Sequence, residues 1–148
     1  PLAREAMKLL IEEAECLQLV GSFNSAATAS DFMEQHVVDL VFLDIQMPGI
    51  TGIEFARTIS KRTLVIFTTA YTEYALDSYE VDAIDYLIKP VEAERFQKAI
   101  EKAQSYHSLL LQEEKEAIET IAAAEYFFVK ANADISKSTS LISSLSKD

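Results

Sequence analysis

The chain has 148 residues, a formal net charge of −11 at pH 7 and one cysteine. This length suffices for one ordinary domain with an appendage, not for two full domains. The acidic charge argues against phosphate-backbone binding, because nucleic-acid affinity needs clustered Lys and Arg. The single cysteine, Cys16, excludes an internal disulfide, and no apolar run approaches the roughly 18 residues of a membrane span. We therefore expect a cytoplasmic protein.

The first part of the chain alternates between helical and strand patterns. Residues 2–14 carry apolar side chains at helical spacing and predict an amphipathic helix. Residues 17–23 predict a strand, and Ser25 can cap a helix over residues 26–35. Residues 38–43 are almost continuously apolar and β-branched. That composition is typical of a strand buried on both faces of a parallel sheet.

The same alternation continues to the final helix. A short helix is predicted after Gly52, a strand over residues 63–69, a helix near residues 72–79 and a strand over residues 83–88. From Val91 onward, apolar positions keep helical spacing over a long stretch, which predicts an extended C-terminal helix. Strands alternating with helices predict an α/β fold with a doubly wound parallel sheet and right-handed crossovers.

Three predicted strands end in groups suited to phosphoryl chemistry. They end in the carboxylate of Asp44, the hydroxyl of Thr69 and the ammonium of Lys89. The carboxyl ends of parallel strands meet at one edge of a sheet, where open α/β folds bind ligands. A carboxylate is an able phosphoryl acceptor, and transfer needs positioning and charge neutralisation. Taken singly, Asp44 has a plainer interpretation as a strand cap, and Thr69 as a simple β-former.

Three segments resemble the receiver domain of two-component response regulators. They are residues 43–52 (LDIQMPGITG), 69–70 (TA) and 86–90 (YLIKP). The resemblance extends over about residues 1–105 and implies a flavodoxin-like fold. Residues 67–75 and 82–87 most resemble receivers that precede a LytTR-type DNA-binding domain, the LytR/AlgR class.

The resemblance also implies roles for individual residues. Asp44 would accept a phosphoryl group from a histidine kinase, Lys89 would pair with one phosphoryl oxygen, and the Thr69 hydroxyl would hydrogen-bond another. Tyr86 would be the switch aromatic that rotates inward on activation. Mg²⁺ would bind Asp44, the backbone carbonyl of Gln46 and an acidic pair on the first strand. Such a domain accepts a phosphoryl group and is no enzyme beyond, at most, autodephosphorylation.

The sequence departs from this family at its start. A receiver begins with a short apolar strand that ends in acidic residues, whereas this sequence begins at the helix that follows. In the family that strand lies in the middle of the sheet, between the strands predicted at 17–23 and 38–43. An empty position there would leave buried backbone groups unpaired, at about 1–3 kcal/mol each. Because the acidic pair of that strand supplies Mg²⁺ ligands, we expect Mg²⁺ binding in an intact receiver, whereas binding by this chain is in doubt.

We divide the chain into a receiver over residues 1–105, a helical linker over 106–124 and a segment 125–148. The last segment is the start of a truncated output domain or a disordered tail. Residues 125–131 are the spare strand candidate for the empty position, but they also resemble the first strand of a LytTR domain, and we prefer that interpretation. The serine-rich tail from Ser136 predicts weak order.

Three functions compete. The leading one is a phospho-acceptor receiver that controls self-association and transcriptional output, with DNA bound only through a missing C-terminal domain. A second is a pseudo-receiver, an interaction module without phosphorylation. A third is an aspartate-nucleophile phosphatase of the haloacid dehalogenase type, which requires a second aspartate two positions after the nucleophile. Gln46 stands at that position.

Two further expectations concern local geometry and association. The Lys89-Pro90 bond is expected to be cis, because prolyl bonds are the common cis peptides. A homodimer is expected through residues 72–110 and the helix after about residue 105. That helix carries an apolar stripe that the receiver core cannot cover, formed by Leu109, Leu110, Leu111, Ile118 and Ile121.

Overall fold

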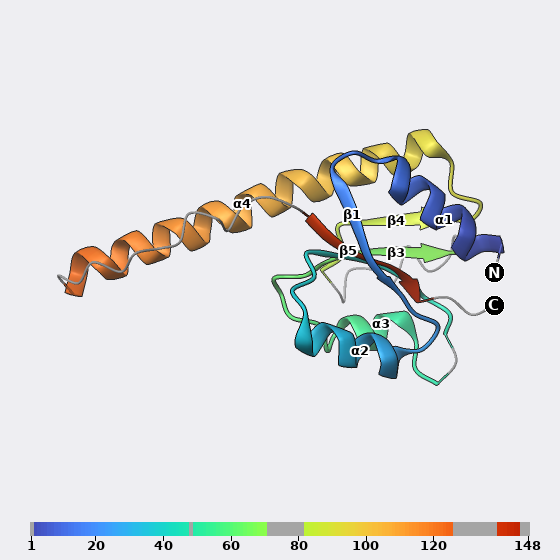
Figure 1. The fold of residues 1–148 in the computed structure, drawn as a ribbon, viewed down its shortest axis with the longest axis horizontal. Helices are drawn as coiled ribbons and strands as arrows, with labels where there is room; N and C mark the ends of the chain where they lie inside the picture. Colours follow the sequence, from blue (N-terminus) through green and yellow to red (C-terminus); the bar gives the residue numbers. More distant parts are fainter. Residues whose placement is uncertain (1, 48, 71–81, 126–138, 146–148) are drawn as a thin grey trace.

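The computed structural model describes residues 2–47, 49–70, 82–125 and 139–145. In chain order the elements are α1 (Leu2–Glu13), β1 (Leu17–Ser22), α2 (Ala26–Gln35), β2 (Leu40–Asp44), α3 (Gly52–Ala56), β3 (Leu64–Thr69), β4 (Asp85–Ile88), α4 (Ala93–Glu125) and β5 (Thr139–Leu145). Figure 1 shows one twisted sheet with helices on its two faces. These elements agree with the sequence patterns as far as α4, except that the helix expected near residues 72–79 lies outside the described ranges. None of the described helices is both long and apolar enough to cross a membrane.

The sheet has five strands in the order β1-β5-β2-β3-β4, and every neighbouring pair is parallel. The position between β1 and β2, called the central slot below, is therefore filled by β5 from the C-terminal segment (Figure 1). The expectation of a weakly ordered tail is wrong for residues 139–145. Serine content gives a low strand propensity, but ladder pairing on both sides outweighs propensity in the middle of a sheet. Residues 126–131, the other candidate for the central slot, lie outside the described part of the chain.

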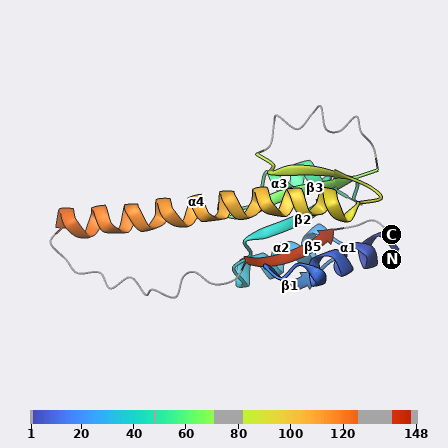
Figure 2. The same cartoon turned by 90° about the horizontal axis from the view of Figure 1, so that it is seen from above.

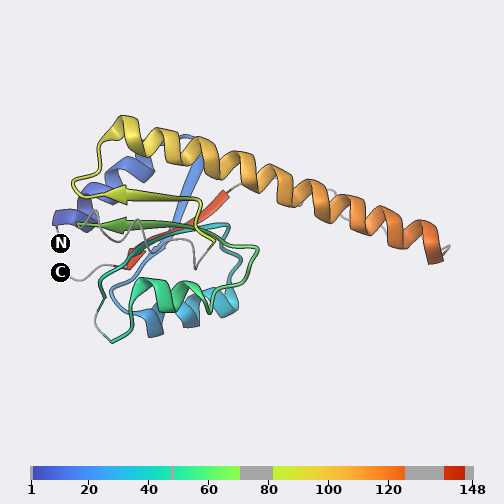
Figure 3. The same ribbon diagram turned by 180° about the vertical axis from the view of Figure 1, so that it is seen from behind.

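Two apolar layers lie on opposite faces of the sheet. Figure 3 shows α1 and α4 on one of these faces and α2 and α3 on the other. One layer joins Phe42 and Ile66 to α1 and to Phe96 and Ile100 of α4, and the rings of Phe42 and Phe96 stack with centroids 5.5 Å apart. The other joins alternate strand residues, such as Phe67, to α2 and α3. Because side chains alternate along a strand, β2 contributes to both layers and is buried throughout. The burial of both faces explains why its sequence is a continuous apolar run.

Helix α4 has 33 residues but packs on the sheet only through its first part. Its fully buried side chains end at Ala103, and Leu110 is the last residue that packs against the core layer. Beyond that point the helix runs well past the sheet (Figure 2). Leu109, one residue before that point, is 59% exposed, and Ile121 on the overhanging part is 54% exposed. The overhang therefore presents apolar side chains that the core of the domain does not cover.

Candidate functional site

The site lies at the carboxyl edge of the sheet, where β2 and β4 end. Asp44 is the last residue of β2 and is only 6% exposed. Lys89 directly follows β4, and its Nζ donates to Asp44 Oδ2 over 2.5 Å. The backbone N–H of Gln46 donates to Asp44 Oδ1 over 2.9 Å. The structure thus brings together Asp44 and Lys89, which the sequence singled out, and the Lys89-Pro90 bond is cis as predicted.

The turn after β2 is closed tightly against Asp44. The Gly52 N–H donates to the Ile45 carbonyl over 2.8 Å, and Thr51 caps α3 by accepting from the Glu54 N–H over 3.1 Å. A Cβ on Gly52 would lie 2.3 Å from the carbonyl oxygen of Asp44, closer than any atom can approach without a backbone shift. Glycine is therefore required here by close approach, and the turn fixes the backbone that carries the carboxylate.

Thr69 lies on β3, the neighbour of β2, and Tyr86 lies on β4, the next strand of the sheet. Thr69 ends β3 fully buried, and its carbonyl accepts the Lys89 N–H over 2.8 Å. Tyr86 is half-buried, and its ring stacks on Phe67 with centroids 5.2 Å apart. These contacts fix the strands that hold the site. The roles predicted for the Thr69 hydroxyl and the Tyr86 ring in activation stay predictions.

A magnesium site needs several oxygen ligands in octahedral geometry. The resemblance implies Asp44 and the Gln46 carbonyl as two of them. Within the described ranges, however, there is no group of three or more His, Cys, Asp or Glu side chains that could hold a metal ion. The residues described here therefore do not amount to a magnesium site.

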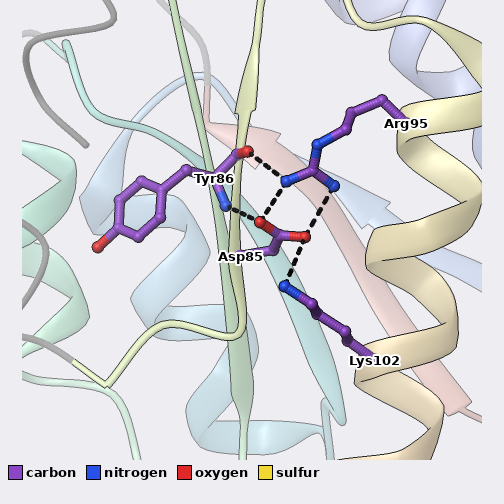
Figure 4. Close-up of polar contacts among 4 residues, drawn as sticks. All are labelled: Asp85, Tyr86, Arg95 and Lys102. Atoms are coloured by element: carbon purple, nitrogen blue, oxygen red, sulfur yellow. Dashed lines mark hydrogen bonds and ion pairs between the residues drawn. The ribbon is translucent and has the colours of Figure 1, made fainter.

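A second charged cluster joins β4 to α4 and was not predicted (Figure 4). Asp85 is 8% exposed and accepts from both guanidinium nitrogens of Arg95, over 2.8 and 2.5 Å. Its Oδ1 also accepts the Tyr86 N–H over 2.8 Å, and Lys102 Nζ lies 3.5 Å from Oδ2. Arg95 further donates to the Tyr86 carbonyl over 3.2 Å. Arg95 thus holds the backbone of the strand that leads to Lys89.

The sequence contains one signal for this cluster. Asp85 interrupts an otherwise apolar strand, and a buried carboxylate requires a cationic or hydrogen-bonding partner. Nothing in the linear sequence selects Arg95 among the cations of α4, because that choice depends on where the helix crosses the sheet.

Acid sensitivity is expected from Asp85. Burial alone would raise the pKa of Asp85, but hydrogen bonds from Arg95 and the Tyr86 N–H, with the charges of Arg95 and Lys102, hold it below its ordinary value of 3.8. The ionised form stabilises the fold above that value, and this contribution is lost as the pH falls from about 3.8 through the lowered value. The Asp85→Asn variant should therefore be less stable by about 1.5–3 kcal/mol at neutral pH.

Urea denaturation at pH 7 and at pH 3 measures this difference. The difference in the free energy of unfolding between wild type and Asp85→Asn should be smaller at pH 3 than at pH 7. The exposed Asp82 provides the control, since Asp82→Asn should follow the wild type at both pH values. If the difference in the free energy of unfolding between wild type and Asp85→Asn is the same at both pH values, ionisation of Asp85 does not stabilise the fold.

A parallel α/β sheet with a lysine-paired aspartate at its carboxyl edge defines a receiver-type domain. Residues 1–101 match the response regulator receiver domain family. The chain therefore belongs to that family, and receiver domains act with histidine kinases in two-component systems.

Curated relatives and solved structures agree with this assignment. The chain is 45% identical over 108 residues to an uncharacterized response regulatory protein of Vibrio cholerae, covering 70% of this chain and 41% of that protein. It is 35% identical over 127 residues to the transcriptional regulatory protein BtsR of Salmonella typhi, and the match covers 82% of this chain and 53% of that protein. The chain thus spans about half the length of these relatives.

Two solved receivers show the likeness in structure. The response regulatory domain of protein mrkE from Klebsiella pneumoniae is 28% identical with a TM-score of 0.66, covering 73% of this chain and 91% of that one. The response regulator protein TrrA of Thermotoga maritima is 30% identical with a TM-score of 0.55, and the match covers 70% of this chain and 90% of that one. The latter was solved in complex with Mg(2+)-BeF. The flavodoxin-like receiver fold of this chain is therefore shared with known receivers.

Proposed function

We propose that Asp44 accepts a phosphoryl group from a histidine kinase. The support is the distance of 2.5 Å between Lys89 Nζ and Asp44 Oδ2 at the carboxyl edge of the sheet. A carboxylate needs no general base to act as a nucleophile. A lysine cation beside it can move from the carboxylate to a phosphoryl oxygen and neutralise charge during transfer.

In the proposed step one carboxylate oxygen of Asp44 attacks the phosphorus of a phosphohistidine. The new O–P bond forms as the N–P bond breaks, and the released imidazole takes a proton from water. Thr69 then hydrogen-bonds a second phosphoryl oxygen and Tyr86 changes its packing on Phe67. The residues described here do not complete a magnesium site, so this chemistry is assigned to Asp44 and Lys89. Turnover is limited to autodephosphorylation.

Replacing the acceptor should remove the adduct. After incubation with acetyl phosphate and Mg²⁺, intact-mass measurement is expected to show one added phosphoryl group on the wild type and none on Asp44→Asn. Asp31→Asn, a change at an exposed carboxylate on α2, is the matched control and should keep the adduct. The measurement is repeated on a chain extended at its amino end by an apolar strand that ends in two aspartates. An equal yield on Asp44→Asn and wild type would contradict the assignment.

The main alternative is a pseudo-receiver that binds partners without phosphorylation. It is favoured by the lack of a metal-binding cluster within the described ranges. The same experiment separates the two, because a pseudo-receiver gives no adduct in either chain. A phosphatase of the haloacid dehalogenase type would instead consume acetyl phosphate, but Gln46 stands where its acid would be needed.

We assign transcriptional control as the output, exerted by a further C-terminal domain that binds DNA. The support is that the relative BtsR is a transcriptional regulatory protein and that this chain spans 53% of it. The net charge of −11 disfavours DNA binding by the present residues. We place the protein in the cytoplasm on its cysteine content and its lack of a long apolar run, and in the LytTR-type class on the sequence resemblance given above.

The overhang of α4 is expected to pair two copies of the chain. His107, Leu111, Glu114, Ile118 and Ile121 recur at alternating steps of four and three residues, which is the spacing of a coiled-coil seam. Light scattering should give a dimer for the wild type and a monomer for Ile118→Glu/Ile121→Glu. Ser108→Glu/Thr120→Glu adds the same charge at exposed polar positions of α4 and should remain dimeric. Equal masses for both variants would exclude this seam.

A further inference from the structure

The segment that completes the sheet is the last one in the chain. Strand β5 pairs with β1 on one side, from Leu17 with Thr139 to Ser22 with Ser143, and with β2 on the other, beginning at Leu40 with Leu141. Within the described residues β1 has no other strand neighbour, since it lies at the end of the strand order. The attachment of β1 to the sheet therefore depends on β5.

Strand β5 matches its neighbours less well than the other strands do. Both of its ladders contain a shift in register, between Leu19 and Gly21 on β1 and between Val41 and Leu43 on β2. The ladders of β2 with β3 and of β3 with β4 run without a shift. The sequence of β5, TSLISSL, is rich in hydroxyl residues although it lies beside the apolar strand β2. Weakly specified strands of this kind are prone to slippage and exchange between chains.

The connection between the core and β5 is long enough for β5 to reach more than one slot. The part of α4 from Leu110 to Glu125 carries the chain about 22 Å away from the core. The following residues 126–138 can span at most about 45 Å when fully extended. The connection is therefore long enough to return to the chain's own slot, with roughly 20 Å to spare by the same measure. A slot in an adjacent copy is within comparable reach when the two α4 overhangs lie side by side.

We propose that two copies of this chain exchange β5, so that the central slot of each domain is filled by the strand of the other. The backbone pairs formed are the same in the exchanged and unexchanged forms, so the balance depends on tether geometry and protein concentration. The occupant is a second copy because the seam on α4 aligns the two helices from which the β5 segments leave. Strand exchange rests on the homodimer proposed above. It does not depend on the proposed phosphorylation of Asp44.

Cysteine pairing tests the exchange directly. In a Cys16→Ser background, Ser22→Cys is introduced in one batch of the full chain and Ser143→Cys in another. These two positions are register partners across β1 and β5, and both changes replace a hydroxyl by a thiol. The batches are mixed at high concentration, opened briefly with denaturant, refolded and treated with a short bis-maleimide, whose two electrophilic groups each form a thioether with one cysteine. Denaturing electrophoresis is expected to show a covalent dimer whose yield falls when the mixture is diluted before refolding.

Controls decide between the outcomes. Ser105→Cys, at an exposed position on α4 and outside the sheet, replaces Ser143→Cys in the matched control and should give no dimer with Ser22→Cys. The double variant Ser22→Cys/Ser143→Cys in one chain reports where the strand lies. If that chain links only within itself at every concentration and the mixture gives no dimer, β5 stays in its own chain and the proposal is overturned. If neither sample links, β5 does not pair with β1 and the proposal is overturned as well.

Discussion

Replacing Ile142 by proline is expected to abolish the cooperative unfolding of the domain. Ile142 lies in the middle of β5, in register with Gly21 on one side and Val41 on the other. Proline removes a backbone donor, and with it a ladder hydrogen bond, from a central strand. Each further ladder group left buried and unpaired adds about 1–3 kcal/mol. The total approaches the roughly 5–15 kcal/mol that stabilises a typical domain. Thermal unfolding followed by far-UV circular dichroism is the measurement.

The control keeps the backbone intact. Ile142→Ala removes most of the side chain but retains the N–H donor, so it should unfold cooperatively at a lower temperature than the wild type. A proline variant that unfolds with the wild-type midpoint would show that β5 is not a structural strand of the sheet. This outcome would also remove the basis for strand exchange.

Replacing Lys89 by alanine is expected to lower the rate of phosphoryl transfer to Asp44 by about 10²–10³-fold, the usual effect of losing one preorganised charge-stabilising donor. In the structure Lys89 Nζ is bound to Asp44 Oδ2, and its side chain is only 25% exposed, so solvent cannot readily substitute for it. The rate of adduct formation from acetyl phosphate, followed by intact mass, measures the effect. It is measured in whichever chain, native or extended, forms the adduct.

The matched control is Lys98→Ala, which removes the same charge from an exposed position on α4. It should leave the rate within about twofold of wild type, because an exposed charge at a distance is largely screened. Lys89→Arg separates charge from geometry, since guanidinium keeps the charge in a different shape. Equal rates for Lys89→Ala and Lys98→Ala would mean that Lys89 takes no part in the transfer.

Much of the fold could be predicted because its causes are local. The strand ending at Asp44 is apolar throughout since both of its faces are buried, and Ser25 caps α2 by accepting from the Thr28 N–H over 3.3 Å. The pairing of Asp44 with Lys89 followed from a general property of parallel sheets, which gather the ends of their strands at one edge. These inferences needed no knowledge of long-range contacts.

The two features that were missed depend on long-range placement. The composition of residues 139–145 predicts weak order, and only the open ladders of β1 and β2 make a strand of them. Likewise, Arg95 and Asp85 meet because α4 crosses β4 at a particular angle. The sequence indicates a strand position between β1 and β2, and β5 lies there, but nothing in the sequence selects residues 139–145 as its occupant. The domain boundaries proposed at residues 105 and 125 stay predictions.

The position of β5 has a consequence for synthesis of the chain. Leu17 pairs with Thr139 and Leu40 with Leu141, so the middle of the sheet cannot form until residues 139–145 have left the ribosome. Contacts this distant in sequence slow folding, because the entropy of closing long loops must be overcome first. Until then β1 and the inner edge of β2 present unpaired backbone groups to other chains. The nascent protein can therefore associate prematurely with other chains. A ribosome-associated chaperone that shields those strand edges should raise the yield of folded protein.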